Sequence, residues 1–429
     1  MPTLVIVGAQ WGDEAKGKIV DVLGHEADVV ARYSGGNNAG HTVIIGDKEF
    51  KFHLLPAGIL HKGTVSILGG GMAICPKSLL EELDRTKQQQ AELGELQISP
   101  AAHVVFPYHK LLDQLEEAAR GDNKIGTTSR GIGPMYTDKV QRVGIRFGEF
   151  VKPELFRERL REVLSFKNRL IELLGGEQIE FEALYNEYKG YAERLSHYVD
   201  DTDTFLQHAV MRKDQILFEG AQGTFLDLDQ GTYPYVTSSH PISGGACLGT
   251  GIGPRAITSV LGVAKAYTTR VGEGPFPTEL KNATGDQIRE QGREYGTTTG
   301  RPRRCGWLDL HALRASCRIN SMSGLIVTRV DVLSGIPKVG VCIGYEVDGE
   351  VLPGLPFTSC EWAAVKPVYQ YFPGWEGDLR KARKFGDLPR EAQKYLEFVE
   401  EFTQTPIAII SIGPDRAETI IQRPDLIWG

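Results

Sequence analysis

The chain has 429 residues, 41% of them hydrophobic and 24% charged, a composition typical of a soluble globular protein. Its formal net charge of −7 argues against a general nucleic-acid-binding protein, so positive charge for a phosphate site has to be gathered locally. The six cysteines form no C-x-x-C pair, no apolar run is long enough to span a membrane, and no charged-then-apolar leader follows Met1. We therefore expect a cytoplasmic protein that binds neither membranes nor nucleic acids.

The first stretch of the chain predicts a phosphate site. Leu4 to Val7 is a short apolar run typical of a buried strand, and Ile19 to Leu23 has the pattern of a helix. The glycine-bearing loop between them would present backbone N–H groups and the positive end of a helix dipole to phosphate. Its Gly12-x4-Gly17-Lys18 spacing is that of a P-loop, but Ile19 stands where a P-loop has the Ser or Thr that binds Mg²⁺. Asp13, inside the loop, is therefore the candidate ligand for Mg²⁺.

The rest of the chain alternates between strand-like and helix-like segments. Helical spacing is found at 76–90, 107–120, 153–174 and 184–198, and apolar strand-like runs occur at 28–33, 42–45, 215–218, 259–267, 324–330 and 407–412. This alternation predicts an α/β fold with one large, mainly parallel central sheet flanked by helices, and a helical layer around 151–200. Because no low-complexity linker divides the chain, we expect residues 1–429 to form a single domain.

Several motifs together resemble adenylosuccinate synthetase over nearly the whole chain. They are QWGDEAKGK (10–18), NNAGHT (37–42), IGTTSRGIGP (125–134), FEGAQGTFLD (218–227), GTYPYVTSS (231–239), TRVGEGPFPTE (269–279), TTTGRPRRCGWLD (297–309) and SIGPDR (411–416). Enzymes of that family join L-aspartate to inosine monophosphate (IMP) with GTP as co-substrate. The resemblance therefore implies a GTP-dependent ligase that forms adenylosuccinate, GDP and phosphate through a 6-phosphoryl-IMP intermediate, and that works as a homodimer.

The resemblance also implies the roles of individual residues. Asp13 takes the proton from N1 of IMP as general base, and His41 donates to the phosphate as charge moves onto GDP. Mg²⁺ is held by Asp13, the backbone carbonyl of Gly40 and phosphate oxygens. GTP is bound by Gly12, Asp13, Glu14, Ala15, Lys16, Gly17, Lys18, Gly40, His41, Thr42, Arg303, Arg329, Val330, Asp331, Ser411, Ile412 and Gly413.

Within this set the Asp331 carboxylate is the group that reads guanine, through N1–H and the 2-amine. Aspartate is bound by a loop made of Thr297, Thr298, Thr299, Gly300, Arg301, Pro302 and Arg303, whose arginines suit carboxylates. IMP is bound by Asn38, Ala39, Thr128, Gln222, Thr237, Val271 and Arg301, with Arg142 reaching the IMP phosphate of the partner subunit.

The sequence departs from the family pattern at five positions. Ala15 and Ser129 replace glycines, Ser34 replaces a glutamine, Pro302 an arginine and Arg329 a lysine. If residue 15 needs a positive φ, alanine costs about 1 kcal/mol there. Two alternatives stay open at this point: a related synthetase acting on a 2-amino purine nucleotide, and a GTP-binding regulatory protein without ligase chemistry. Asp13 argues against the first alternative, because a carboxylate at N1 would have to share space with a substituent on C2.

Overall fold

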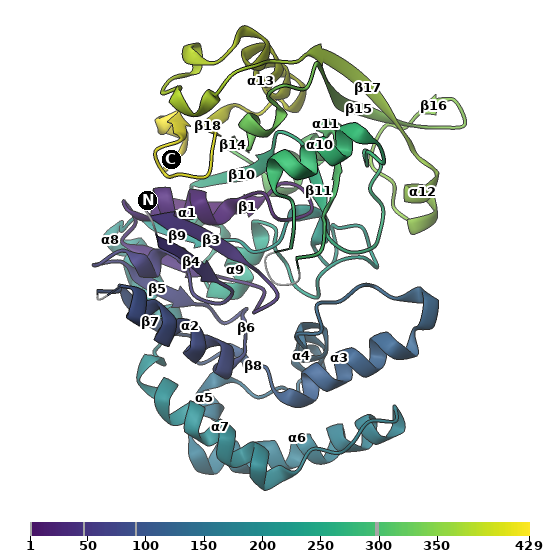
Figure 1. Ribbon diagram of the computed structural model, residues 1–429. Helices are drawn as coiled ribbons and strands as arrows, with labels where there is room; N and C mark the ends of the chain where they lie inside the picture. Colours follow the sequence, from purple (N-terminus) through teal and green to yellow (C-terminus); the bar gives the residue numbers. More distant parts are fainter. Residues whose placement is uncertain (1, 46–47, 91, 297–299) are drawn as a thin grey trace.

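The computed structural model describes residues 2–45, 48–90, 92–296 and 300–429 (Figure 1). At its centre lies a nine-stranded sheet in the order β19-β18-β14-β10-β1-β9-β2-β5-β7, in which β18 and β19 are antiparallel and the other neighbours are parallel. The prediction of one large, mainly parallel sheet is therefore confirmed. The strands are β1 (Thr3–Gly8), β2 (Val29–Arg32), β5 (Val65–Leu68), β7 (Glu95–Ile98), β9 (Ile216–Glu219), β10 (Ser259–Lys265), β14 (Gly324–Thr328), β18 (Ile407–Ser411) and β19 (Thr419–Ile421).

The apolar run of β1 shows why helices cover both faces of the sheet. Leu4 and Ile6 pack into the core formed with α1 (Lys16–Gly24) and α2 (Pro76–Gln89). Val5 and Val7 pack on the opposite face, against α8 (Thr202–Arg212) and α9 (Gly244–Thr250). Because successive side chains of a strand point to opposite faces, a continuous apolar run is stable only when both faces are covered.

The order of the strands brings distant segments to one edge of the sheet. β9 lies between β1 and β2, so Phe218 pairs with Val5 on one side and with Ala31 on the other. Parallel strands end at the same edge, and open α/β sheets bind ligands there. The carboxyl-terminal residues of β1, β2, β9, β10, β14 and β18 at this edge are Gly8, Arg32, Glu219, Lys265, Thr328 and Ser411.

A helical layer lies at one end of the molecule, as predicted around 151–200 (Figure 1). It consists of α3 (Pro107–Ala119), α4 (Ile132–Gln141), α5 (Phe147–Phe150), α6 (Pro153–Leu173) and α7 (Phe181–Leu195). Its core is aromatic, with the rings of Phe106 and Tyr188 stacked 4.8 Å apart. The buried carboxylate of Asp138 joins three of these helices, because it accepts a hydrogen bond from His109 Nε2 at 3.0 Å and pairs with Lys167.

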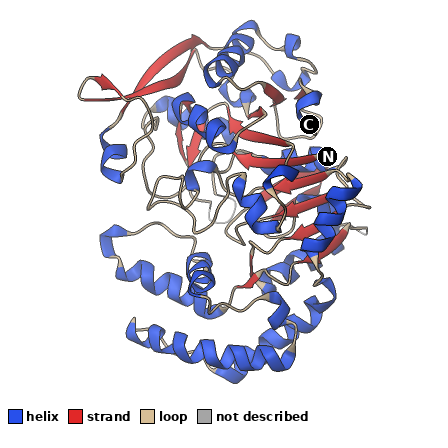
Figure 2. Ribbon diagram, turned by 180° about the vertical axis from the view of Figure 1, so that it is seen from behind, coloured by secondary structure: helices blue, strands red, loops and turns tan. Residues whose placement is uncertain are grey.

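The sequence did not predict a smaller sheet near the carboxyl end of the chain. β15 (Lys338–Val347) and β17 (Lys366–Pro373) run antiparallel and carry β16 (Glu350–Val351) and α12 (Ser359–Ala364) on a projecting arm (Figures 1 and 2). β17 contains two prolines and few fully buried side chains, so it lacks the continuous apolar pattern of the central strands. α11 (Leu310–Asn320) packs against β15, α13 (Arg390–Thr403) packs against β17, and α10 (Ala283–Gly292) lies against β12 (Arg304–Gly306).

Short strand pairs complete the structure. β3 (His41–Ile45) and β4 (Lys48–Phe52) form an antiparallel pair, as do β11 (Thr268–Arg270) and β12. β6 (Ala73–Ile74) and β8 (His103–Val104) form a parallel pair. β13 (Leu308–Asp309) pairs in parallel with β15. In the part of the chain that the structure describes, no helix combines the length and the apolar character needed to cross a membrane.

Candidate active site

A cleft of about 1240 Å³ opens at the carboxyl edge of the central sheet. Sites for one small molecule usually measure roughly 300–1,000 Å³, so this cleft has room for more than one ligand. Most of the predicted site residues line it: Gly12, Asp13, Ala15, Lys16, Gly17, Lys18, Asn38, Ala39, Gly40, His41, Thr42, Thr128, Gln222, Thr237, Val271, Arg303, Arg329 and Asp331. Residues far apart in the sequence thus meet in one place.

The remaining predicted residues lie outside the lining. Glu14, Val330, Ser411, Ile412 and Gly413 are buried behind the wall of the cleft. Arg142, Gly300, Arg301 and Pro302 are exposed, and Arg301 Nη2 lies 3.9 Å from Glu273 Oε1. Thr297, Thr298 and Thr299 fall outside the described residues.

The loop before α1 is shaped by the buried carboxylate of Glu14. Glu14 Oε1 accepts hydrogen bonds from the backbone N–H groups of Gln10 and Gly12, at 3.1 and 2.8 Å, and Oε2 pairs with Lys16 Nζ at 2.6 Å. Gly12, Asp13 and Ala15 have positive φ, a geometry that turns successive N–H groups toward a concave anion site. Ala15 has φ 68°, so the condition under which alanine is strained at this position is met. Ile19 is fully buried in the core and offers no metal ligand.

Lys18 contacts the segment at the end of the central sheet. Its ammonium donates to Ser411 Oγ at 2.8 Å and to the carbonyls of Gly413 and Glu418 at 2.7 and 3.0 Å. Burial lowers the pKa of Lys18 to about 8, although the charge of Glu418 raises it. The lysine of the P-loop pattern thus links α1 to the segment predicted to hold guanine.

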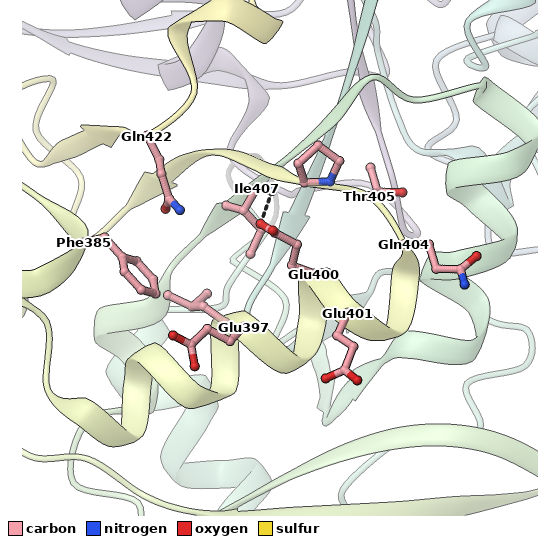
Figure 3. A pocket seen from close by; sticks show the side chains of 10 residues that line it. Phe385, Glu397, Glu400, Glu401, Gln404, Thr405, Ile407 and Gln422 are labelled. Carbon is pink, nitrogen blue, oxygen red and sulfur yellow. Dashed lines mark hydrogen bonds between the residues drawn. The ribbon is translucent and has the colours of Figure 1, made fainter.

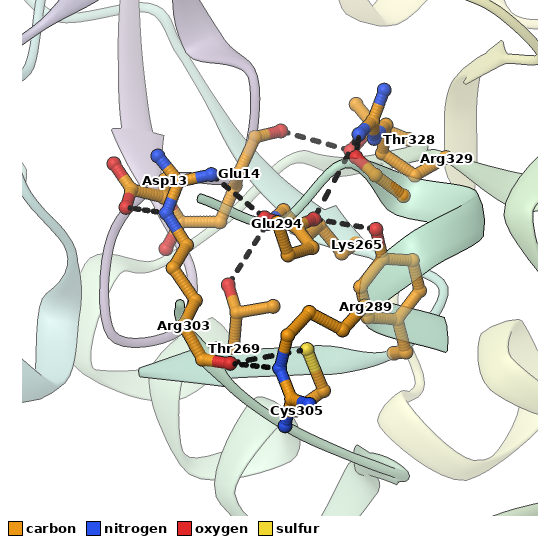
Figure 4. A network of polar contacts seen from close by, with 12 residues as sticks. Asp13, Glu14, Lys265, Thr269, Arg289, Glu294, Arg303, Cys305, Thr328 and Arg329 are labelled. Carbon is orange, nitrogen blue, oxygen red and sulfur yellow. Dashed lines mark hydrogen bonds and ion pairs between the residues drawn. The ribbon is translucent and has the colours of Figure 1, made fainter. Parts of the chain in front are cut away.

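The predicted base and an arginine of the aspartate loop are joined by a charge network (Figure 4). Arg303 Nε lies 2.7 Å from Asp13 Oδ2, and its Nη1 donates to Glu294 Oε2 at 2.8 Å. Glu294 Oε1 accepts from Lys265 Nζ and Tyr267 Oη, at 2.6 and 2.5 Å. Burial opposes ionisation of Glu294, yet Lys265, Arg329 and Arg303 hold its pKa at about 2. The network therefore keeps Arg303 beside Asp13 at the floor of the cleft.

His41 begins β3 and faces a second buried carboxylate. Its Nδ1 lies 2.7 Å from Oε1 of Glu219, the last residue of β9. Burial lowers the pKa of His41; the Glu219 charge raises it, and the Arg32 and Lys16 charges lower it further. Burial likewise opposes the ionisation of Glu219, but His41 and Arg32 keep its pKa below the usual value. Glu219 has no predicted role, and neither do Arg32, Glu294 and Lys265. The signal for Arg32 and Lys265 was a charge inside an apolar strand pattern.

Two residues that were predicted to contact ligands, Gln222 and Asp331, carry polar atoms without hydrogen-bond partners among the described residues. Both amide atoms of Gln222 are buried and unpartnered, and its backbone has φ 55°. Oδ1 of Asp331 is also buried without a partner, and burial raises the pKa of this carboxyl group. Unpaired buried polar atoms are costly in a folded protein and often mark functional sites. Because both residues line the cleft, these atoms can be satisfied by a ligand.

Comparison with known proteins decides the family. The family model described as adenylosuccinate synthetase matches residues 5–420. This chain belongs to that family. The adenylosuccinate synthetase of Carboxydothermus hydrogenoformans is 52% identical over 422 residues, which cover 98% of this chain and 99% of the relative. Full-length similarity at this level identifies the activity as that of an adenylosuccinate synthetase, a GTP-using ligase of purine biosynthesis.

Solved structures support the same assignment. The fully ligated adenylosuccinate synthetase of Plasmodium falciparum matches with a TM-score of 0.94 at 39% identity, covering 98% of this chain and 100% of that one. The succinoaminodeoxyadenylate synthetase of cyanophage S-2L, solved with dGMP and dATP, matches with a TM-score of 0.62 at 20% identity, covering 98% and 95%. The second likeness extends to the fold alone. Membership of the adenylosuccinate synthetase family thus disfavours both alternatives that the sequence left open.

A second hollow of about 480 Å³ lies along α13 and, among the described residues, shares no lining residue with the cleft (Figure 3). Three glutamates, Glu397, Glu400 and Glu401, lie around it, and Glu400 Oε2 accepts the N–H of Ile407 at 2.8 Å. None of the predicted site residues that the structure describes lines this hollow.

Proposed function

We propose that the cleft binds IMP, L-aspartate and GTP together, with Asp13 as general base and His41 as the donor to the departing GDP. The observation that supports this most is that both side chains share one cleft with the unpartnered Gln222 and Asp331. In this proposal the Asp331 carboxylate accepts from N1–H and the 2-amine of guanine, while the Gln222 amide contacts IMP.

The reaction then proceeds in two steps. Asp13 takes the N1 proton of IMP, O6 attacks the γ-phosphate of GTP, and the bond from that phosphorus to the β–γ bridging oxygen breaks. His41 donates to the oxygen on which negative charge develops. The amine of aspartate then attacks C6, and phosphate leaves with the O6 oxygen. Adenylosuccinate, GDP and phosphate are the products.

Arg303 has two partners in this scheme. Beside Asp13 it neutralises the carboxylate, and a carboxylate of aspartate offers it a bidentate partner instead. Movement of the guanidinium from Asp13 to aspartate frees the Asp13 carboxylate to reach the N1 proton of IMP when the second substrate is bound. Glu294 retains hold of the arginine through Nη1.

The donor set fits a magnesium ion. The Asp13 carboxylate and the backbone of Gly40 line the same cleft, and hard oxygen ligands suit Mg²⁺. Because the side chain of Ile19 has no oxygen, Asp13 and the Gly40 carbonyl are the protein ligands in this proposal. A bound Mg²⁺ would neutralise charge on the GTP phosphates.

We further propose that the chain acts as one domain within a cytoplasmic homodimer. Residues from Trp11 to Pro414 line one cleft, which supports a single working unit. Arg142 is exposed at the end of α4, outside the cleft of its own chain, where it is available to a partner's IMP phosphate. All six cysteines are unpaired, in keeping with a reducing compartment.

This proposal can be tested by measuring product formation by the purified wild type and by the Asp13→Asn variant. With IMP, GTP, aspartate and Mg²⁺ the wild type should form adenylosuccinate, and the variant should lose at least roughly 10²-fold in turnover. Asp348→Asn is a matched control, because Asp348 is also an exposed aspartate with positive φ but lies on the projecting arm. Near-wild-type turnover of Asp13→Asn would contradict its role as base, and efficient use of GMP in place of IMP would contradict the substrate.

A further inference from the structure

We propose that Glu219 is a positioning residue, which holds the imidazole of His41 by its Nδ1 side and directs Nε2 into the cleft. This inference rests on the proposed role of His41 and adds a residue that acts only through it. No group of Glu219 needs to touch a substrate, because its carboxylate lies behind His41.

The position of Glu219 is set by its surroundings on all sides. It ends β9, the strand between β1 and β2, and its side chain is fully buried. Oε2 accepts the backbone N–H of Ala57 at 3.0 Å, and Oε1 lies 2.7 Å from His41 Nδ1 and 3.8 Å from Arg32 Nε. The Ala57 N–H fixes one oxygen of the carboxylate, and the other lies 2.7 Å from His41 Nδ1.

Arg32 explains how this carboxylate stays charged in the core. It is fully buried at the end of β2, the strand next to β9, and its Nη1 donates to the carbonyl of His53 at 2.7 Å. A buried carboxylate is stable as an ion only when a nearby charge compensates its desolvation. Arg32 supplies that charge independently of the protonation of His41. The groups that act on His41 are thus Glu219 from β9, Arg32 from β2 and Lys16 from α1.

The opposite side of His41 is closed by α1. A Cβ atom on Gly17 would lie 2.9 Å from the Cβ of His41, so glycine lets the helix approach the histidine closely. The imidazole is therefore confined between the first turn of α1 and Glu219. A carboxylate at Nδ1 favours the tautomer with the proton on that nitrogen. Nε2 is then the nitrogen that faces the phosphates in the cleft. It donates to them when the ring carries a proton on both nitrogens, the form that a neighbouring carboxylate favours.

A double-mutant cycle with His41→Ala and Glu219→Gln tests the proposal. Loss of such an orienting partner usually costs about 10–100-fold in activity, so Glu219→Gln should lower kcat by that factor with little change in KM for IMP. In the His41→Ala background the same substitution should change kcat by less than about 2-fold, because the residue it positions is gone. An equal loss in both backgrounds would overturn the proposal. If His41→Ala itself keeps wild-type kcat, the proposed role of His41 fails as well, so the two failures are distinguishable.

Glu82→Gln is the matched control for removing a buried carboxylate. Glu82 is also nearly fully buried, and it accepts the backbone N–H groups of His53, Leu54 and Leu55 instead of contacting His41. Its effect on kcat should be the same with and without His41. A second measurement does not depend on a Glu219 variant: ¹⁵N-histidine NMR of the wild type should show the His41 proton on Nδ1, with the signal assigned by its loss in His41→Ala. A neutral ring protonated on Nε2 would overturn the proposal.

Discussion

Asp331→Asn tests whether the far end of the cleft reads guanine. Asp331 lies in the short 3₁₀ helix Val330–Leu333 that follows β14, and its Oδ1 is buried without a hydrogen-bond partner among the described residues. A carboxylate presents two acceptors, which match N1–H and the 2-amine of guanine. Asparagine presents one acceptor and one donor, so one of the two contacts becomes a clash between donors.

The magnitude follows from the loss of a charge-assisted contact in a buried place. Such contacts contribute roughly 1.5–3 kcal/mol, and a loss of about 2 kcal/mol corresponds to about a 30-fold change in affinity. We expect KM for GTP to rise by about that factor, with KM for IMP and aspartate nearly unchanged. Xanthine has a carbonyl in place of the 2-amine, so it fits the amide of asparagine. The variant should therefore prefer XTP to GTP.

Initial rates of adenylosuccinate formation with GTP, XTP and ITP as the varied nucleotide measure these effects. Asp415→Asn is the matched control, because both Asp415 and Asp331 act on the charge of Lys18 while Asp415 Oδ1 is already occupied by the N–H of Ala417. It makes the same change in charge and should leave the order GTP over XTP intact. A constant KM for GTP in Asp331→Asn, with a raised KM for IMP or aspartate, would refute the assignment of guanine to this residue.

Two other predictions concern stability and the dimer. Glu294 has a pKa of about 2 in the folded protein against an ordinary value of 4.5, so its contribution to stability is fully present above pH 4.5 and is lost as the pH falls toward 2. Glu294→Gln should lower the free energy of unfolding in urea by about 3 kcal/mol at pH 7, a deficit that shrinks below pH 4.5; a deficit independent of pH would contradict the assignment. Arg142→Leu should weaken IMP binding by about 2 kcal/mol or more while the fold stays intact. Mixing it with Asp13→Asn should restore activity in heterodimers, and no recovery in proven heterodimers would show that Arg142 does not serve the partner's site.

Much of the fold was predictable because most residues of the central strands are apolar. β14 and β18 fall within predicted strand-like runs, and β1 and β9 match theirs to within a residue at each end. α2, α3 and α6 match predicted helical segments to within a residue. The spacing of apolar residues along the chain indicates whether one face or both faces of a segment are buried. That spacing distinguishes a strand from a helix. The arm built from β15 and β17 was missed because β17, the partner that β15 requires, is partly exposed and contains two prolines.

The site residues were predicted from motifs that follow the ends of strands. Asp13, Gln222 and Asp331 each follow a strand, and the parallel arrangement brings their segments to one edge. The sequence alone therefore determined the fold class, the glycine-bearing loop before α1 and most of the predicted residues that gather in the cleft. These features could be predicted because each one depends on the types of residues that follow one another over a short stretch of the sequence.

Only the tertiary structure decided which charges meet. Lys18 binds a segment almost 400 residues away, Arg303 lies against Asp13, and His41 lies against Glu219. These pairs depend on the order of the strands, above all on β9 lying between β1 and β2, and on loops that fold back over the sheet. No local pattern encodes that order, because an apolar strand can pair with any other. The energies of buried charges, which require a partner at close range, are therefore settled only when the whole chain has folded.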